Sequence, residues 1–306
     1  MLDIKRLRVL KEVVETGSVS AAAAALNFTP SAVSQQIATL ERETGTVLLE
    51  HAGRGVRPTA AAILLCDHTA RVLAAVDEAE DALAALRAGH TGRVRVGAFP
   101  TAGASLVPQA LAAFERRLPN VWLDLVVVET DEALASLRDG SIDIAVVIEG
   151  PPDEPWSDGL CRQHLLSDPF RVVLPRDHPM ASHRAVDLST LAQDRWVGIS
   201  TCPGYCQQVA TEACRQAGFV PLFGLEADEY PTAQAFVAAG LGVMLAPLLA
   251  LGHAVHNGVV VRRVKGGQPT REVWAVTRPA LADLLPVRAM LDELHSSARR
   301  FITTRD

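Results

Sequence analysis

Apolar residues in the first part of the chain follow the spacing of short helices. From Ile4 to Val14 they recur every three or four positions, which predicts an amphipathic helix. Gly17 is suited to end that helix, and Ser18 is suited to cap a short alanine-rich helix that reaches Leu26. The sequence therefore predicts two short helices separated by a tight turn.

A third helix is predicted to begin at Thr29 and Pro30. A threonine side chain can cap a helix, and proline fits the first helical position, where its missing N–H costs nothing. Val33, Ile37 and Leu40 share one face of this helix, which predicts that this face is buried. The remaining polar side chains are left for solvent or a ligand, and they are Ser31, Ser34, Gln35 and Gln36.

Beyond Gly45 the pattern changes to two strand-like segments. Residues 47–49 and Val56 are apolar and flank a Gly53-Arg54-Gly55 tip. Glycine permits a tight reversal of the backbone, so this stretch predicts a small two-stranded wing.

A long helix follows, capped by Thr59 and running to about Ala88. Its apolar residues form a seam over about three heptads, which predicts pairing with the same helix of a second chain. Residues 89–92 contain two glycines and are expected to link this helix to the next domain. The seam consists of Leu65, Val72, Val76, Ala79, Leu83 and Leu86, with Thr69 at its one polar position.

From Arg93 onward, strand-like and helix-like segments alternate. This rhythm predicts a mostly parallel sheet that is covered on both sides. A first group has strands at 94–98, 122–128 and 142–148 and helices at 105–118 and 131–138. A second group has strands at 170–174, 196–199, 222–227 and 243–246 and helices at 188–191, 207–217 and 232–239, before a last strand at 272–277 and a last helix at 284–301.

Composition and charge limit the functions that fit. The chain has 306 residues, enough for about two domains, and no uncharged apolar run reaches the ~18 residues of a membrane span. The net charge is −6, but residues 1–60 carry +1 and the remainder −7, so any DNA contact is expected near the N-terminus. The first fifteen residues lack an apolar signal core, so we expect a cytoplasmic protein whose five cysteines are reduced.

The third helix has the features of a DNA-recognition helix. A helix, a turn and a second helix with a polar outer face fit the major groove, where Gln, Ser and Thr read base edges. Gln35 is the best candidate for a direct base contact, and Arg54 and Arg57 on the wing are suited to phosphates or the minor groove. The neighbouring candidates for DNA contact are Thr29, Pro30, Ser31, Ser34 and Gln36. From the pattern alone, a solvated face in an ordinary helical domain fits these residues equally well.

Residues 2–59 resemble the N-terminal domain of LysR-type transcriptional regulators. The similarity runs through LRVLKEVVETGSVSAAAAALNFTPSAVSQQIATLERETGTVLLEH and GRGVRPT. It implies that residues 29–36 enter the major groove and that a wing arginine contacts the DNA backbone. His51 stands where the family commonly has arginine, so the phosphate contact of that arginine is not carried over. Histidine at this position is expected to weaken DNA affinity or to make it pH-sensitive, because histidine titrates near neutral pH. The other departures from the family pattern are Leu49, Pro58 and Ala62 or Ile63.

The resemblance continues in GRVRVGAFPTAGASLVPQALAAFERRLPNVWLDLVVVE, GSIDIAVV and FVAAGLGVMLAP. It implies an all-α winged helix-turn-helix domain, a long linker helix and an α/β effector-binding domain of two subdomains, similar to type 2 periplasmic binding proteins. The domains are expected at 1–58, 59–90 and 91–306. Within the last of these, subdomain I covers about 91–162 and 269–306 and subdomain II about 163–268, with chain crossings near 161–166 and 264–272.

An effector pocket is expected between the subdomains, at the carboxyl ends of the strands. Two predicted helix starts face this position, and because helix N-termini favour anions, a small carboxylate is the expected effector. Asp228 would favour an amine or hydroxyl on the same ligand. The alternative is that the hydroxyl groups in this set only cap helices. The candidate effector-binding residues are Pro100, Thr101, Ala102, Ser200, Thr201, Asp228 and Thr232.

Other reactive residues give weaker signals. Cys202 and Cys206 lie four residues apart near a predicted helix start, where a thiolate is stabilised. A thiol redox sensor or a cytoplasmic solute-binding protein of the same fold is therefore the alternative function. His253 and His256 lack further ligands at metal-binding spacing. No phosphate-binding loop or nucleophile elbow occurs, so we expect no enzymatic activity, no metal and no cofactor.

Taken together, the sequence predicts a ligand-responsive transcription regulator. Its expected partners are double-stranded promoter DNA, a small anionic effector and further copies of itself, with RNA polymerase as an additional candidate. Two-fold symmetry would place two recognition helices on a partly palindromic site. The resemblance implies a dimer of dimers that bends DNA.

Overall fold

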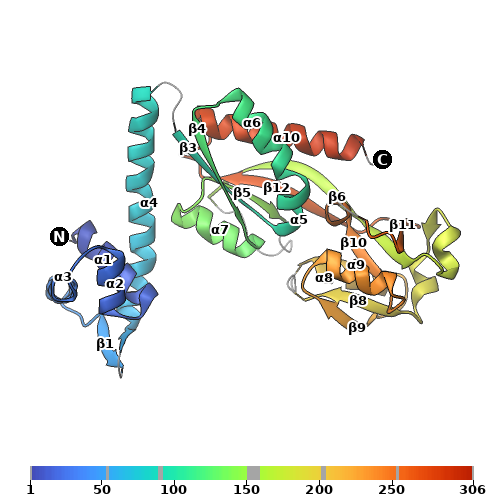
Figure 1. Ribbon diagram of the computed structural model, residues 1–306, viewed down its shortest axis with the longest axis horizontal. Helices are drawn as coiled ribbons and strands as arrows, with labels where there is room; N and C mark the ends of the chain where they lie inside the picture. The colour runs from blue at the N-terminus through green and yellow to red at the C-terminus, as the bar shows by residue number, and fades with distance from the viewer. Residues whose placement is uncertain are drawn as a thin grey trace. The chain divides into compact units, whose positions relative to one another are not determined.

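The computed structural model describes residues 2–52, 55–88, 92–149, 159–200, 205–252 and 255–304. The chain forms two compact units, whose main bodies lie within Met1–Thr91 and within Gly92–Asp306 (Figure 1). Among the residues that the structure describes, no helix has both the length and the apolar character needed to cross a membrane.

The N-terminal unit begins with three helices: α1 (Ile4–Thr16), α2 (Val19–Ala25) and α3 (Pro30–Thr44). Gly17 ends α1 in the left-handed conformation, and the Ser18 side chain accepts a hydrogen bond from Ala21 N at 3.4 Å. This confirms the predicted stop and restart. The apolar faces of the helices meet in one core, which includes Leu7, Leu10, Val13, Ala22, Val33, Ile37, Leu40 and Leu48.

The wing consists of β1 (Leu49–Ala52) and β2 (Gly55–Pro58), paired antiparallel with Glu50 opposite Arg57. Glu41 of α3 attaches this wing to the helices, since its Oε1 accepts hydrogen bonds from Leu48 N at 2.8 Å and Leu49 N at 3.2 Å. A carboxylate that accepts backbone N–H groups makes strong, directional bonds. The orientation of the wing is thus fixed from α3 itself.

Helix α4 (Ala60–Ala88) leaves the wing, and Thr59 caps it as predicted, accepting from Ala62 N at 3.3 Å. Thr69 is buried and donates to Leu65 O at 2.6 Å. The apolar seam beyond it remains accessible in the single chain: Val72, Val76 and Leu83 are 40%, 37% and 61% exposed. An apolar stripe of this kind is what a second helix would cover, so pairing between chains stays a prediction.

The first half of the C-terminal unit contains three parallel strands, with β3 (Gly92–Ala98) between β4 (Val121–Val127) and β5 (Ile144–Ile148). Its core is formed by apolar side chains of these strands together with those of the surrounding helices. The helices are α5 (Pro100–Ser105), α6 (Val107–Arg117), α7 (Thr130–Asp139) and α10 (Leu285–Thr303).

Two long strands join the halves of this unit. They are β6 (Cys161–Pro175) and β12 (Thr270–Thr277), which pair antiparallel from Thr270 opposite Pro169 to Thr277 opposite Cys161. Because β12 also pairs antiparallel with β5, the sheet of eight strands is mixed. The prediction of a mostly parallel sheet is therefore wrong. Alternating strands and helices describe each half well, but the chain passes between the halves in opposite directions, and those two passages lie side by side.

The second half packs on the far end of β6 (Figure 1). It contains a separate parallel pair, β8 (Arg195–Ile199) and β9 (Leu222–Ala227), with helices α8 (Tyr205–Gln216) and α9 (Tyr230–Ala238). Both β10 (Met244–Pro247) and β11 (Val259–Val264) pair with β6, and β11 also pairs with the short β7 (Ala185–Val186). Strand β11 was not predicted, although its run of three valines after Gly258 is a strand signal.

Candidate DNA-binding surface and effector cleft

Helix α3 has two chemically different sides. Val33, Ile37 and Leu40 are buried in the core of the N-terminal unit. Thr29 caps the helix, and its Oγ1 lies 3.3 Å from Ala32 N and 3.1 Å from Ser31 Oγ. The predicted contact residues lie on the other side: Thr29, Pro30, Ser31, Ser34 and Gln35 are exposed, and Gln36 is half-buried. The polar side of α3 is thus accessible within this unit.

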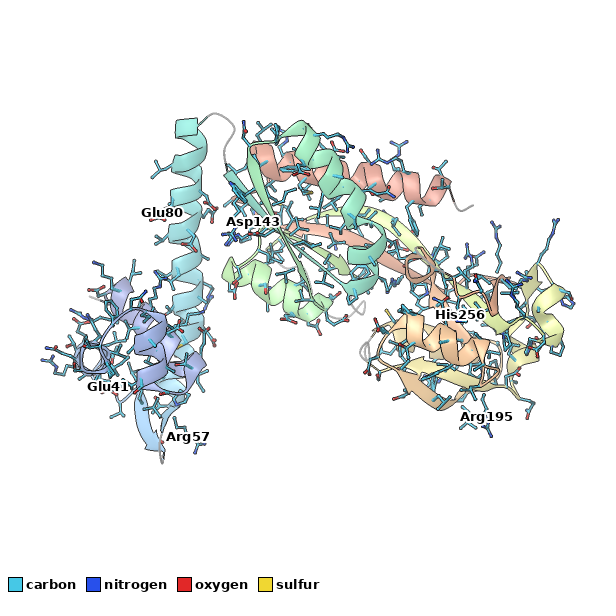
Figure 2. The ribbon with its side chains drawn as sticks, viewed as in Figure 1. Glu41, Arg57, Glu80, Asp143, Arg195 and His256 are labelled. Atoms are coloured by element: carbon cyan, nitrogen blue, oxygen red, sulfur yellow. The ribbon has the colours of Figure 1, made fainter. Side chains whose placement is uncertain are left out.

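The wing carries an exposed arginine, Arg57. Arg57 extends from β2, while Glu41 lies on α3 (Figure 2). Arg54 and the side chain of His51 lie outside the described residues, so only Arg57 of the predicted wing cations can be placed. An exposed guanidinium on a wing can contact phosphates without reading sequence.

The C-terminal unit contains a cleft of about 480 Å³, a typical volume for a small-molecule site. It opens at the carboxyl ends of β3, β4, β5, β8 and β9, where an open α/β sheet is expected to bind ligands. A larger hollow of about 690 Å³ lies between α8 and the loop from β11 to β12. Among the described residues, the lining of this hollow contains no buried charged side chain, whereas the lining of the cleft contains Arg271. The cleft is therefore the better candidate for a ligand site. Its apolar lining includes Phe99, Ile148, Ile199, Tyr230, Pro231 and Leu249.

Arg271 of β12 lies at the base of the cleft and is only 2% exposed. Its Nε and Nη2 both lie 2.9 Å from Asp168 Oδ2, on the facing strand β6. Nη2 also donates to Thr101 Oγ1 at 2.7 Å, and Nη1 donates to Cys206 Sγ at 3.2 Å. The guanidinium carbon lies 5.0 Å from the centre of the Phe99 ring. One buried side chain therefore contacts both halves of the unit.

Asp168 is fully buried and balances this charge. Burial raises the pKa of its carboxyl group, whereas the charge of Arg271 and the N–H of Leu249, 3.0 Å from Oδ1, act in the opposite direction. A buried charge without such partners would be very costly. The pair is therefore a structural element of the crossing strands as well as the floor of the cleft.

The predicted effector residues divide into three groups. Pro100, Thr101 and Asp228 line the cleft. Ala102 does not, because its side chain is fully buried in the core, and neither Ser200 nor Thr232 belongs to the described lining. Ser200 still lies beside it, since its hydroxyl donates to Asp228 Oδ1 at 2.7 Å. Thr201 lies outside the described residues.

Several lining residues were not predicted from the sequence. Glu129 follows β4, and Glu229 precedes α9, so both occupy strand ends of the kind that led to Thr101 and Asp228. Burial raises the pKa of Glu129; the charge of Arg271 lowers it by less, and the nearby acids Asp131 and Glu132 raise it further. The position of Glu129 could have been found by the same rule. That of Arg271 could not, because its role depends on the pairing of two strands far apart in sequence.

The cysteines differ in their surroundings. Burial raises the pKa of Cys214 to about 12. Burial and the nearby carboxylates of Glu15 and Asp67 raise the pKa of Cys66 to about 11. Neither thiol therefore ionises readily. Cys206 is different because its sulfur contacts the guanidinium of Arg271. Cys202 and His253 lie outside the described residues. Within those that are described, no group of three or more potential ligands is placed to hold a metal ion.

Comparison with known proteins gives matches to both units. Residues 4–63 match the family model "Bacterial regulatory helix-turn-helix protein, lysR family", and residues 87–299 match "LysR substrate binding domain". The chain is 30% identical to the transcriptional dual regulator GltC of Bacillus subtilis (strain 168), over 93% of each chain. It is 28% identical to a hydrogen peroxide-inducible genes activator of Dickeya chrysanthemi, over 97% of this chain and 95% of that one.

The same fold occurs in a solved complex. The crystal structure of full-length CbnR complexed with its target DNA matches 98% of this chain and 100% of that chain, with a TM-score of 0.70 and 20% sequence identity. The similarity extends over both units and shows that the two chains share a fold.

We expect Asp168→Asn to destabilise the C-terminal unit by about 3–5 kcal/mol, because it leaves the buried guanidinium of Arg271 without a counter-charge. All four tryptophans lie in this unit, so urea unfolding followed by tryptophan fluorescence reports its stability directly. Asp292→Asn is the matched control, since it removes an exposed ion pair with Arg117 and should cost less than about 1 kcal/mol. Equal losses for the two variants would contradict a structural role of the buried pair.

Proposed function

Because this chain belongs to the LysR family of bacterial transcriptional regulators, we propose that it controls transcription by binding promoter DNA through α3 and the wing, in response to a small molecule held in the cleft. The family is one of regulators and not of enzymes. The observation that carries the proposal is the two-sided character of α3, whose apolar side forms the core while its polar side is accessible. A solvated helix in an ordinary domain would not need a wing attached to it.

In this proposal α3 reads the major groove. Gln35 is exposed on the polar side of the helix. A glutamine side chain can form two hydrogen bonds with the major-groove edge of adenine. Arg57, with Arg54 at the wing tip, contacts phosphates or the minor groove and so positions the protein without specifying sequence. The residues that complete this surface are Thr29, Pro30, Ser31, Ser34 and Gln36.

Pairing of α4 supplies the two-fold symmetry that a palindromic site requires. The exposed stripe of Val72, Val76 and Leu83 supports this pairing, because burial of apolar side chains against a second copy is favourable. Two such pairs would form a dimer of dimers that bends DNA and contacts RNA polymerase in the cytoplasm. Changes in the cleft would then act on DNA through the packing of subunits.

The cleft is the proposed effector site. Pro100, Thr101 and Asp228 belong to its lining, and Ser200 contacts Asp228 beside it. Thr201, the other candidate from the sequence, lies outside the described residues. Arg271 contacts both halves of the unit, so a ligand that changes the spacing of the halves would act through it. The carboxylate effector expected from the sequence stays a prediction.

A thiol-based response is the second candidate, and one contact favours it. Cys206 lines the cleft, and its sulfur lies 3.2 Å from Arg271 Nη1, where a positive charge stabilises a thiolate. The relative from Dickeya chrysanthemi is named for hydrogen peroxide. Oxidation at this position would alter the same network that a ligand would alter.

We expect Gln35→Ala to reduce discrimination at one base position by about 1–3 kcal/mol and Arg57→Ala to weaken all sequences alike. Arg57→Ala should also lower the slope of log affinity against log salt by about 1, because one phosphate contact is lost. Quantitative mobility-shift assays with the promoter and single-base variants measure both effects. Gln216→Ala on exposed α8 is the control, and no change in either variant would contradict the proposed surface.

We expect Thr101→Val to spare DNA binding but to blunt the response to inducing conditions, because the hydroxyl that accepts from Arg271 is lost while the side-chain volume is kept. A promoter–reporter fusion in the native host measures the response, and a mobility shift measures DNA affinity. Thr232→Val is the matched control outside the lining. A full response in Thr101→Val would show that the cleft has been assigned to the wrong function.

The thiol candidate gives a different expectation for Cys206→Ser. If the response is thiol-based, peroxide treatment changes the DNA mobility of the unmodified protein and leaves Cys206→Ser unaffected, whereas Cys214→Ser behaves like the parent. Mass spectrometry of the treated protein identifies the modified sulfur. Parent-like behaviour of Cys206→Ser removes this candidate and leaves the ligand-responsive function in place.

A further inference from the structure

The cleft has an unexpected balance of charge. Among the described residues that line it, Glu129, Asp228 and Glu229 are acidic and Arg271 alone is basic. Glu129 comes from the first half of the unit, and Asp228 and Glu229 come from the second. Carboxylates therefore approach the cleft from both sides.

The guanidinium of Arg271 already interacts with other groups of the protein. Each nitrogen of Arg271 has a partner: Nε and Nη2 contact Asp168, Nη2 also contacts Thr101, and Nη1 contacts Cys206. Asp168 neutralises the charge at 2.9 Å. A carboxylate ligand would have to take these bonds from a fully buried counter-ion, which is costly. Arg271 is thus poorly available to an anion.

Glu129 has the opposite character. Within the described part of the chain, no hydrogen bond or ion pair engages the side-chain carboxylate of Glu129, although this residue is half-buried. The charge of Arg271 is not sufficient to offset its burial, and the pKa of Glu129 remains raised. A donor from outside the chain would supply what the protein does not.

Most of the remaining lining is apolar. Phe99, Ile148, Ile199, Pro231 and Leu249 surround the acids in a volume of about 480 Å³. Pockets of this kind bind an organic body by burial and orient it with a few polar groups. The apolar walls thus fit an apolar part of a ligand, and the carboxylates fit a positively charged or hydrogen-bond-donating part of the same ligand.

We propose that the effector is a small organic amine, with an apolar body against these walls and an ammonium group facing Glu129, Asp228 and Glu229. This inference rests on the proposed function, because it names the ligand class of the same cleft. It differs from the carboxylate expected from the sequence, because that expectation rests on helix N-termini alone and not on the side chains that line the cleft.

The test uses the full chain and a panel of matched probes. Each probe set consists of a primary amine, the carboxylate and the carboxamide on one carbon skeleton, such as phenethylamine, phenylpropionate and phenylpropionamide, with alkyl and indolyl sets beside them. Thermal shift and calorimetry measure binding. Stabilisation by amines, with weaker or no effect of the matched carboxylates and amides, supports the proposal.

Variants locate the binding. Glu129→Gln should weaken the best amine by at least about tenfold, the loss expected when one charge-assisted hydrogen bond disappears. It should not destabilise the free protein, because a partly buried charge is removed. Asp228→Asn gives a second variant on the opposite side of the cleft. Glu226→Gln, on β9 and outside the lining, makes the same change of charge and should bind like the parent.

Three outcomes would overturn the proposal. They are preferential binding of carboxylates, unchanged amine binding in both Glu129→Gln and Asp228→Asn, and stabilisation by no amine in the panel at 10 mM, a concentration of order 10² above a typical weak-ligand Kd of about 0.1 mM. None of these outcomes touches DNA binding, which the promoter mobility shift measures separately. Failure of the amine inference and failure of the regulator proposal are therefore distinguishable.

Discussion

The buried pair of Arg271 and Asp168 is the interaction on which the C-terminal unit depends. It lies where the chain crosses between the two halves, on strands that are antiparallel neighbours with these two residues in register. Two charges removed from water are tolerated only when hydrogen bonds satisfy their remaining atoms.

Those bonds come from both halves. Thr101 belongs to the first half, and Cys206 and the backbone of Leu249 belong to the second. The electrostatic need of one ion pair therefore ties the halves together at the place where a ligand would enter. Any change in their spacing must alter these bonds, and this gives the fold a physical route from the cleft to the arrangement of the two halves.

The same ion pair determines which charged groups of the cleft are available to a ligand. Because Asp168 neutralises Arg271, no described lining residue presents a free cation. Glu129 is half-buried, and within the described residues no hydrogen bond engages its carboxylate. In the N-terminal unit a carboxylate has the opposite role: Glu41 is fully used in holding the wing to α3. Glu41 fixes geometry because two backbone N–H groups donate to its carboxylate, whereas no N–H group of the described residues donates to that of Glu129.

The sequence by itself determined the local elements of the N-terminal unit and the accessible polar side of α3 that we propose as the DNA-binding surface. Periodicity and caps at Gly17, Thr29 and Thr59 located the helices to within a few residues, because these signals act over one or two turns of chain. The split of α3 into an apolar and a polar side followed from spacing alone. The rule that ligands bind at strand ends likewise placed Pro100, Thr101 and Asp228 at the cleft.

Only the tertiary structure decided the strand order, the mixed sheet and the charge of the cleft. Residues 168 and 271 are distant in the chain, and nothing local to either one indicates that they neutralise each other. The burial of Ala102 and the exclusion of Thr232 from the lining depend in the same way on packing between elements. Short-range patterns fix which way a helix or strand faces, but the net charge of a pocket is a sum over residues that only folding brings together.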